Sequence, residues 1–240
     1  MKLLITHDGE KYFFQGEDVH TRYGYVSKDD INNAKFGDAV QTNKGKKMTV
    51  INSSFNDSYL RIRRAPQIIP KKDIGLIFSE IMPQKDWIVV DAGSGSGGMC
   101  CFIAPYVKKV YSYDIRDDHI NITLDNKKNL GLKNLEIKNH DIYLGIPKKK
   151  VNLLILDVPE PWKAVKHAVT SLVPGGYIVS YSPCLPQVSD FVEEVRKYDK
   201  LAYIKTSEII ERVWEVEGRK IRPMSQPIGH SGFLSFVRKI

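Results

Sequence analysis

The sequence predicts an α/β fold with a central, mostly parallel β-sheet, preceded by a small β-rich domain at the N-terminus. Two observations carry this prediction. After about residue 66, short apolar runs of strand length alternate with longer segments whose apolar residues recur at helical spacing. Before that point, turn residues such as Gly16, Gly24 and Gly37 separate only short apolar segments. Strand–helix alternation is typical of a parallel sheet with helices on both faces.

Composition sets broad limits on the partners of the chain. The 240 residues suffice for one good-sized domain and a small second one. The 36 lysines and arginines exceed the 28 acidic residues, which gives a formal net charge of +8. Such an excess attracts polyanions, although a solvated basic surface without a partner explains it equally well. No stretch approaches the roughly 20 apolar residues of a membrane span, so we expect no membrane partner.

The N-terminal residues and the cysteines indicate the compartment. The apolar run Leu3–Ile5 is too short for a signal peptide. Cys100, Cys101 and Cys184 form neither a disulfide framework nor a metal-ligand spacing. We therefore expect a cytoplasmic protein without a structural metal.

Residues 1–62 are expected to form the small β-rich domain. Asp8-Gly9 lies between the apolar stretches Leu3–Ile5 and Tyr12–Phe14, which is a hairpin signal. Arg61–Pro66 then marks the boundary. We predict two domains, 1–62 and 63–240, of which the second carries the strand–helix alternation.

The elements of the second domain follow in a regular order. Asp73–Met82 is predicted to be a helix, because its apolar residues recur at helical spacing. Strands are predicted at 87–90, 110–113, 135–138, 153–156 and 177–181, with helices at 117–130, 162–172 and 188–198. Three tail segments, 202–209, 212–216 and 232–237, are expected to be antiparallel strands that close the sheet.

A glycine-rich loop follows the first of these strands. Ligands of open α/β sheets bind beyond the carboxyl ends of the strands, so this is where a cofactor site is expected. Glycines let the backbone approach a ligand closely, and the next helix offers free N–H groups. A tight structural turn is the alternative explanation of the same glycines. The cofactor-binding candidates in this loop are Asp91, Gly93, Ser94, Gly95, Ser96, Gly97 and Gly98.

Acidic residues after the next strands make the signal more specific. Asp114 lies 114 − 91 = 23 residues after Asp91, where an acid can bind the ribose hydroxyls of a nucleoside. Asp141 follows the third strand, and its carboxylate can accept a hydrogen bond from an adenine amino group, with Ile142 as apolar support. A nicotinamide dinucleotide also fits these features. However, the spacing Gly93-x-Gly95-x-Gly97 differs from the pyrophosphate-binding pattern, and Asp91 repels a diphosphate but can bind an ammonium group. The pattern favours S-adenosylmethionine.

The fourth strand runs into Asp157-Val158-Pro159-Glu160-Pro161-Trp162. A carboxylate at this position, in a loop stiffened by prolines, lies where a substrate is expected to arrive. Trp162 can stack on an unpaired base, or it can be a core residue. Asp157 is the main catalytic candidate and also a cofactor-binding candidate, with a helix N-cap as the structural alternative. Glu160 is a weaker catalytic candidate.

Several segments occur together in an order that resembles a known family. They are Gln67–Asp73, Asp91–Gly97, Tyr113–Arg116, Asp141–Tyr143, Leu156–Trp162, Tyr181–Cys184, Ile221–Met224 and Gly229–Phe233. In this combination the chain resembles the tRNA (adenine-N1)-methyltransferase family of archaeal or bacterial type. The resemblance covers nearly the whole chain, and the ordered set is more specific than any single motif.

The resemblance implies a Rossmann-like class I methyltransferase domain behind a small β-domain, with S-adenosylmethionine as cofactor. It implies methyl transfer to N1 of an adenine in the T-loop of tRNA, at position 58 and in archaeal members also at 57. It also implies a homotetramer, and it adds Gln67 and Ile68 to the cofactor site. Two residues depart from the family pattern: Ile69 stands where many relatives have an aromatic residue that contacts the target base, and Asp114 stands where Glu is common.

Two other functions stay open at this stage. One is a methyltransferase of the same fold that acts on a protein or a small molecule, and the other is a non-catalytic RNA-binding subunit. RNA contacts are expected from three basic clusters, with a fourth run as the weakest candidate. The clusters are Lys44, Lys46 and Lys47; Arg61, Arg63 and Arg64; Arg219, Lys220 and Arg222; and the weakest run is Lys148–Lys150.

Overall fold

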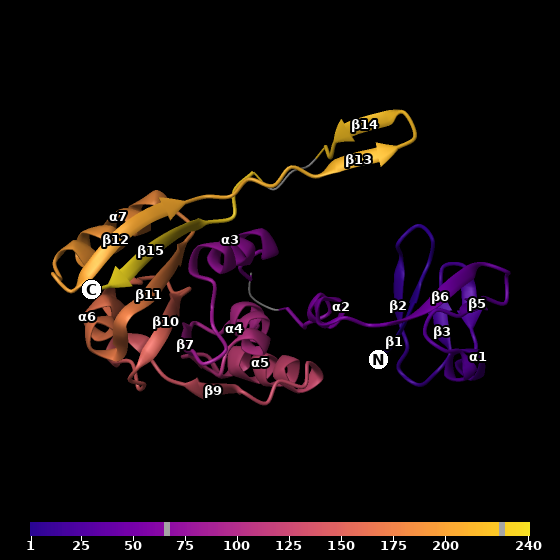
Figure 1. Ribbon diagram of the computed structural model, residues 1–240, viewed down its shortest axis with the longest axis horizontal. Coiled ribbons are helices and arrows are strands. Elements are labelled where there is room, and N and C mark those ends of the chain that lie inside the picture. The colour runs from indigo at the N-terminus through magenta and orange to yellow at the C-terminus, as the bar shows by residue number, and fades with distance from the viewer. Residues whose placement is uncertain (65–67, 226–228) are drawn as a thin grey trace. The chain divides into compact units, whose positions relative to one another are not determined.

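The computed structural model describes residues 1–64, 68–225 and 229–240. The chain divides into two compact units, Met1–Arg61 and Ile62–Ile240, which are considered separately below (Figure 1). Within the described residues, no helix combines the length and the apolar character needed to cross a bilayer.

The N-terminal unit is built on an antiparallel sheet of order β2-β1-β6-β5. The predicted hairpin at Asp8-Gly9 is confirmed, because it joins β1 to β2 with Leu4 opposite Tyr12. Leu4, Ile31 and Val50 lie in the core of the unit. The elements are β1 (Lys2–Ile5), β2 (Lys11–Phe13), β3 (Val19–Thr21), β4 (Gly24–Val26), α1 (Lys28–Asn33), β5 (Ala39–Gln41), β6 (Lys47–Asn52) and α2 (Phe55–Tyr59).

The second unit contains a seven-stranded sheet of order β12-β15-β11-β10-β7-β8-β9. Its strands are β7 (Ile88–Ala92), β8 (Lys109–Asp114), β9 (Leu135–Asn139), β10 (Val151–Leu156), β11 (Leu172–Ser182), β12 (Leu201–Ser207) and β15 (Phe233–Lys239). The five strands predicted before residue 182 are confirmed, and they pair in parallel. β15 runs antiparallel to both of its neighbours. The chain order reverses between β7 and β10, which is the switch point where such sheets bind ligands.

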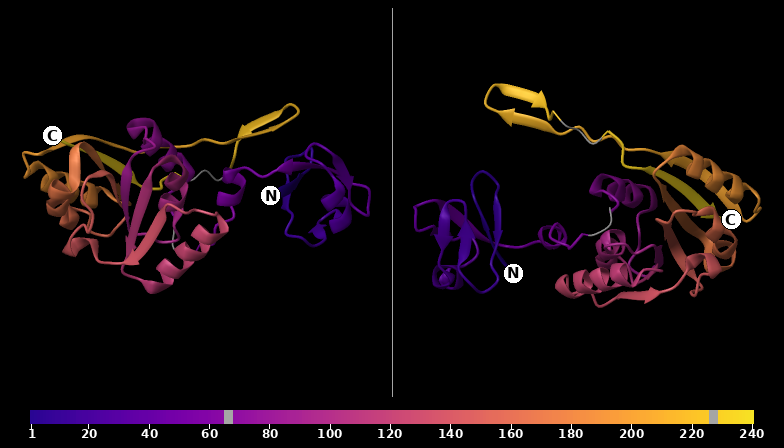
Figure 2. Two further views of the ribbon diagram at one scale, coloured as in Figure 1. Left: turned by 60° about the horizontal axis from the view of Figure 1, so that its bottom comes forward. Right: turned by 180° about the vertical axis from the view of Figure 1, so that it is seen from behind.

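Helices cover both faces of this sheet, as the alternation predicted (Figures 1 and 2). The helical elements are α3 (Lys71–Ile81), α4 (Gly98–Ile103), η1 (Ala104–Tyr106), α5 (Asp117–Asn129), η2 (Ile142–Leu144), α6 (Trp162–Ser171) and α7 (Leu185–Arg196). Apolar residues of α3 and α4 pack on one face of the central strands. Those of α6 and α7 pack on the other face. The two apolar layers fix the sheet between the helices. Because strands β7 to β11 are parallel, their carboxyl ends lie at the same edge of the sheet.

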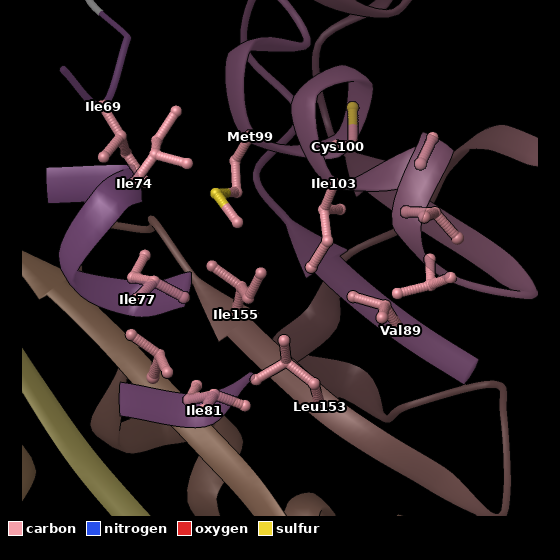
Figure 3. Close-up of a cluster of buried hydrophobic side chains, with 14 of the residues drawn as sticks. Ile69, Ile74, Ile77, Ile81, Val89, Met99, Cys100, Ile103, Leu153 and Ile155 are labelled. Atoms are coloured by element: carbon pink, nitrogen blue, oxygen red, sulfur yellow. The ribbon is translucent and has the colours of Figure 1, made fainter. Parts of the chain in front are cut away.

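Ile69 belongs to the first of these layers. Its side chain is buried and lies beside Ile74, with Met99 nearby, as Figure 3 shows. The residue that departs from the family pattern therefore fills the apolar core under α3.

The prediction for the tail was wrong in one element. Segment 212–216 was expected to join the main sheet, but β13 (Trp214–Glu217) pairs with β14 (Lys220–Pro223) as a separate two-stranded hairpin. The cause is local: Gly218, at a φ of 57°, turns the chain so that Glu217 and Lys220 face each other directly. The other two tail segments are confirmed as β12 and β15.

Candidate active site

A cavity of about 660 Å³ lies beyond the carboxyl ends of the central strands. The five strands β7 to β11 each contribute residues to its lining, from the end of the strand or from the segment that follows. The lining includes Ala92, Gly93 and Gly95 after β7, Asp114–Arg116 and His119 after β8, His140–Tyr143 after β9, Asp157–Glu160 after β10, and Tyr181, Pro183 and Gln187 from β11 onward. This is the edge at which the sequence predicted a ligand site.

The glycine loop divides into two parts. Gly93 and Gly95 line the cavity. Gly97 does not, and a Cβ there would lie 2.9 Å from Thr123 Cγ2 at a φ of 80°, so packing and backbone conformation both require glycine. Gly98 is likewise required by packing, since a Cβ would lie 2.9 Å from Ile68 Cβ. The structural explanation of the glycines therefore holds for the second part of the loop.

The two serines of the loop are buried and make structural bonds. Ser94 Oγ donates to Asp114 Oδ2 over 3.4 Å. The backbone carbonyl of Ser96 accepts from Asn126 Nδ2 over 2.8 Å, and the Asn126 amide also bonds the backbone of Arg63. The loop is thus fixed from α5 and from the chain that precedes α3.

Asp114 lies on the cavity wall with both oxygens engaged. Oδ2 accepts from the Gly95 backbone N–H over 2.9 Å and lies 3.3 Å from His119 Nδ1. Oδ1 accepts from the Arg116 N–H over 3.0 Å. These bonds hold the carboxylate in one orientation between the glycine loop and α5, where it still has acceptor lone pairs for a hydroxyl ligand.

Asp91 is buried directly before the cavity residues Ala92 and Gly93. Its Oδ2 accepts from Ser112 Oγ over 2.6 Å, while Oδ1 is buried and has no hydrogen-bond partner among the described residues. Burial raises the pKa of Asp91 to about 7, and the charges of Asp157 and Asp114 act in the same direction. An unpartnered buried carboxylate oxygen of this kind is suited to a cationic ligand group.

Asp141 and Ile142 follow β9 and both line the cavity. Asp141 caps η2, because its Oδ1 accepts from the Tyr143 N–H over 2.9 Å. Ile142 is buried against the apolar layer of α6 and α7. Ile68 lies against Gly98, and Gln67 lies outside the described residues.

Asp157 lies at the carboxyl end of β10 and lines the cavity. Its backbone bonds the start of the glycine loop: the N–H donates to the Ala92 carbonyl over 2.5 Å, and the carbonyl accepts from the Gly93 N–H over 3.2 Å. Burial raises the pKa of Asp157 to about 7, and the negative charge of Asp114 adds to this. The alternative explanation, a helix N-cap, does not apply, since Pro161 occupies the N-cap position of α6.

The neighbours of Asp157 differ from the expectation. Glu160 lines the cavity and pairs with Lys163 over 2.6 Å. Trp162 is the first residue of α6 and is found neither in the cavity lining nor in the apolar layers of the described residues. The base-stacking role predicted for Trp162 therefore has no support in this geometry.

Sequence reasoning missed the wall that β11 contributes. Tyr181 and Pro183 line the cavity, and so does Gln187 from the first turn of α7. Gln187 Nε2 donates to the Pro159 carbonyl over 2.9 Å, which ties the loop after β10 to α7. The available signal was the motif Tyr181–Cys184, which spans the end of its strand, just as Asp114 and Asp157 stand at the ends of theirs.

The basic clusters are partly neutralised by acids. Lys46 pairs with Asp8, and Lys220 and Arg222 both pair with Glu215. Lys148–Lys150 precedes β10 and so lies at the amino ends of the strands, away from the cavity edge. Among the described residues, no group of three or more His, Cys, Asp or Glu side chains is arranged to hold a metal ion.

A nucleoside with a cationic tail fits this site. Asp114 offers lone pairs to ribose hydroxyls, while the raised pKa values of Asp91 and Asp157 favour binding of a cationic ammonium or sulfonium group, which stabilises their ionised forms, over binding of a diphosphate. The cavity lies at the switch point of a sheet whose strand order is that of nucleoside-binding α/β folds. The fold and the site define a Rossmann-like class I methyltransferase.

Comparisons with known proteins narrow the class to a family. A model of the family described as the tRNA methyltransferase complex GCD14 subunit matches residues 59–226, well over half of the chain. The chain therefore belongs to this family, as the resemblance predicted.

Two curated relatives match over nearly their whole length. The tRNA (adenine(57)-N(1)/adenine(58)-N(1))-methyltransferase TrmI of Methanocaldococcus jannaschii is 29% identical, over 99% of this chain and 94% of the relative. The tRNA (adenine(58)-N(1))-methyltransferase TrmI of Thermus thermophilus is 26% identical, over 99% of this chain and 96% of the relative.

Solved structures share the fold. An S-adenosylmethionine-dependent O-methyltransferase from Thermotoga maritima is 25% identical and superposes with a TM-score of 0.86, over 100% of this chain and 92% of that chain. The tRNA (m1A58) methyltransferase TrmI from Aquifex aeolicus is 22% identical, with a TM-score of 0.82 over 100% and 96% of the two chains.

Proposed function

We propose that this protein transfers a methyl group from S-adenosylmethionine to N1 of an adenine in the T-loop of tRNA, at position 58, with position 57 as a second target. The observation that carries the proposal is Asp157, an acid of raised pKa in the cavity beyond β10, one strand from the glycine loop. The family match and the names of the relatives support the tRNA substrate.

Each acidic residue of the site is proposed to bind a different part of the cofactor. Bound S-adenosylmethionine supplies an electrophilic methyl group on a sulfonium. Asp114 accepts hydrogen bonds from the ribose hydroxyls, and Asp141 accepts one from the adenine amino group, with Ile142 against the ring. Asp91 and the Gly93–Gly95 backbone face the ammonium end. Ile68, Ser94, Ser96, Gly97 and Gly98 support this site from behind, and Gln67 stays a cofactor-binding candidate by resemblance alone.

Asp157 is proposed as the catalytic residue. Adenine N1 carries a lone pair and no proton, so no general base is needed to free it. Positive charge develops on the ring during methyl transfer and spreads to the exocyclic amine. A carboxylate that accepts a hydrogen bond from this amine interacts with it more strongly as the positive charge grows. This interaction stabilises the transition state more than the bound substrate. It also orients N1 toward the methyl group.

Positive charge in the three basic clusters is proposed to hold the tRNA backbone. Lys44 and Lys47 of the first cluster, Arg64 of the second and Arg219 of the third have no ion-pair partner among the described residues. Free cations of this kind release counterions when they contact phosphates. Lys46, Lys220 and Arg222 are weaker candidates because acids already neutralise them.

The chain is proposed to be a cytoplasmic homo-oligomer, a tetramer by resemblance. The β13–β14 hairpin supports the oligomer, because Trp214, Val216 and Ile221 are each more than half exposed. The two strands pair with no other strand of the described residues. Apolar strands left uncovered in this way are typical of subunit interfaces.

The proposed function is tested by incubating the protein with unmodified tRNA and S-adenosylmethionine labelled in the methyl group. We expect label in the T-loop as N1-methyladenosine, located by primer extension, and none in added protein. Asp157→Asn keeps the shape but loses the charge, so it is expected to lower kcat at least about a hundredfold. A wild-type protein that labels protein extract or small molecules instead would refute the proposal.

A further inference from the structure

A buried polar network lies beside the β11 wall of the cavity. Lys72 and Asp73 begin α3, and their side chains are 8% and 0% exposed. Lys72 Nζ donates to Asp73 Oδ1 over 2.7 Å, to the Ile209 carbonyl over 2.6 Å and to Ser231 Oγ over 2.5 Å. Ser231 Oγ in turn donates to Asp73 Oδ2 over 2.7 Å. The network fixes Ser231, just before β15, to the start of α3.

Gly232 follows Ser231 and lies against the aromatic ring of Tyr181. A Cβ on Gly232 would lie 2.4 Å from Tyr181 Cζ, 2.6 Å from Cε2 and 2.8 Å from the hydroxyl oxygen. The φ of Gly232 is outside the left-handed region, so the requirement for glycine is one of space alone. A methyl group at this position needs about 1 Å more room to reach ordinary carbon contact.

Tyr181 lines the cavity in which the acceptor base of the proposed reaction has to bind. It is 8% exposed and lines the cavity together with Asp157. β10 and β11 are parallel with Leu156 opposite Ser180, so Asp157 and Tyr181 follow at the same level of adjacent strands. Burial raises the pKa of Tyr181 to about 12, so its hydroxyl is a hydrogen-bond donor at neutral pH. A flat ring beside a carboxylate makes a slot suited to a planar base.

We propose that Gly232, held in place by Lys72, Asp73 and Ser231, is a positioning residue that sets the Tyr181 ring against the acceptor base. The inference rests on the proposed function and adds the device that aligns its substrate. A displaced ring tilts the base away from the methyl donor, and a misplacement of 1 Å can cost about a hundredfold in rate. The cofactor contacts lie on other strands, so cofactor affinity is expected to stay unchanged.

The experiment is a double-mutant cycle of Gly232→Ala and Tyr181→Ala, with Gly229→Ala as the matched control. Gly229 lies three residues earlier, and a Cβ there meets no atom of the described residues within 4 Å. We expect Gly232→Ala to lower kcat on tRNA about 10- to 100-fold, with the calorimetric affinity for S-adenosylmethionine unchanged. Gly229→Ala should behave like wild type. Gly232→Ala in the Tyr181→Ala background should cause no further loss, because the ring through which it acts is gone.

Other outcomes refute the inference. Additive losses in the cycle, a wild-type kcat for Gly232→Ala or for Tyr181→Ala, or a parallel loss of cofactor affinity would each overturn it. If circular dichroism shows that Gly232→Ala does not fold, Ser231→Ala replaces it in the cycle, since it keeps the glycine and removes two hydrogen bonds. A wild-type protein that methylates no tRNA overturns the proposed function itself, whereas additive losses in an active enzyme overturn this inference alone.

Discussion

The raised pKa of Asp157 predicts that cofactor binding depends on pH. In the ligand-free protein this pKa is raised to about 7, mainly by burial. A cationic ligand favours the ionised carboxylate, so binding near neutral pH releases a proton. With a pKa of about 7, roughly a tenth of the carboxyl is ionised at pH 6 and roughly nine-tenths at pH 8. The affinity for S-adenosylmethionine attributable to this group should therefore rise about tenfold over that range.

The assay is isothermal titration calorimetry at pH 6, 7 and 8, in two buffers of different ionisation enthalpy to count released protons. Asp157→Asn is the matched control, because the ammonium group of the ligand titrates equally in both proteins. The wild-type minus variant difference isolates Asp157. A difference that stays constant from pH 6 to pH 8, with no extra proton release by the wild type, would show that Asp157 does not face the cationic part of the cofactor.

The same pKa predicts a change in stability. The folded chain prefers the protonated acid, so this group stabilises the fold fully below pH 3.8, and that advantage is lost as the pH rises to about 7. The shift corresponds to about 4 kcal/mol as an upper limit, because the side chain is only partly buried. Asp157→Asn avoids the loss, so it should raise the Tm of the ligand-free protein at pH 8 more than at pH 5. Equal Tm changes at the two pH values would contradict this assignment.

Three further predictions address the cofactor, the RNA and the assembly. Asp114→Ala should weaken S-adenosylmethionine binding about 10- to 150-fold in calorimetry, with Ser94→Ala, which removes a long bond to the same carboxylate, close to wild type. Lys44→Glu with Lys47→Glu should lower tRNA affinity and flatten its dependence on salt in filter binding, and unchanged binding would remove this cluster from the interface. Light scattering should give a mass well above 27.4 kDa, and Trp214→Ser should reduce it if the hairpin is the contact.

The strand ends of the site were predictable because their signal is local. A short apolar run that stops at an acid marks both the strand and the residue that emerges at its carboxyl end, as for Asp114 and Asp157. The roles of the glycines were less predictable. Gly97 and Gly98 are required by Thr123 and Ile68, which come from distant parts of the chain, and the sequence does not tell which neighbours a loop will meet.

The prediction that segment 212–216 joins the main sheet was wrong for a similar reason. The pattern of 212–216 predicts a strand but does not say which strand it pairs with. The turn at Gly218 brings β14, the next segment of the chain, directly opposite β13, so the two strands pair with each other. The role of Gly232 was hidden as well. Its environment depends on Tyr181, which lies 51 residues earlier in the chain (232 − 181), and on an antiparallel register that only the folded sheet defines.

The distribution of charge constrains how an RNA can use this cavity. The chain as a whole carries a net charge of +8, yet Asp114 and Asp157 line the cavity and Asp91 is buried directly before its residues Ala92 and Gly93. Phosphates are therefore attracted to the outer surface and repelled from the site of chemistry. A nucleobase is neutral, so it can enter where its own backbone cannot. The acceptor adenine must leave its stack and extend into the cavity alone, at a cost of a few kcal/mol that is smaller for a base in a loop than for one in a duplex. The acidic residues of the cavity thus favour a cationic methyl donor, and they also favour a base that enters without its phosphates.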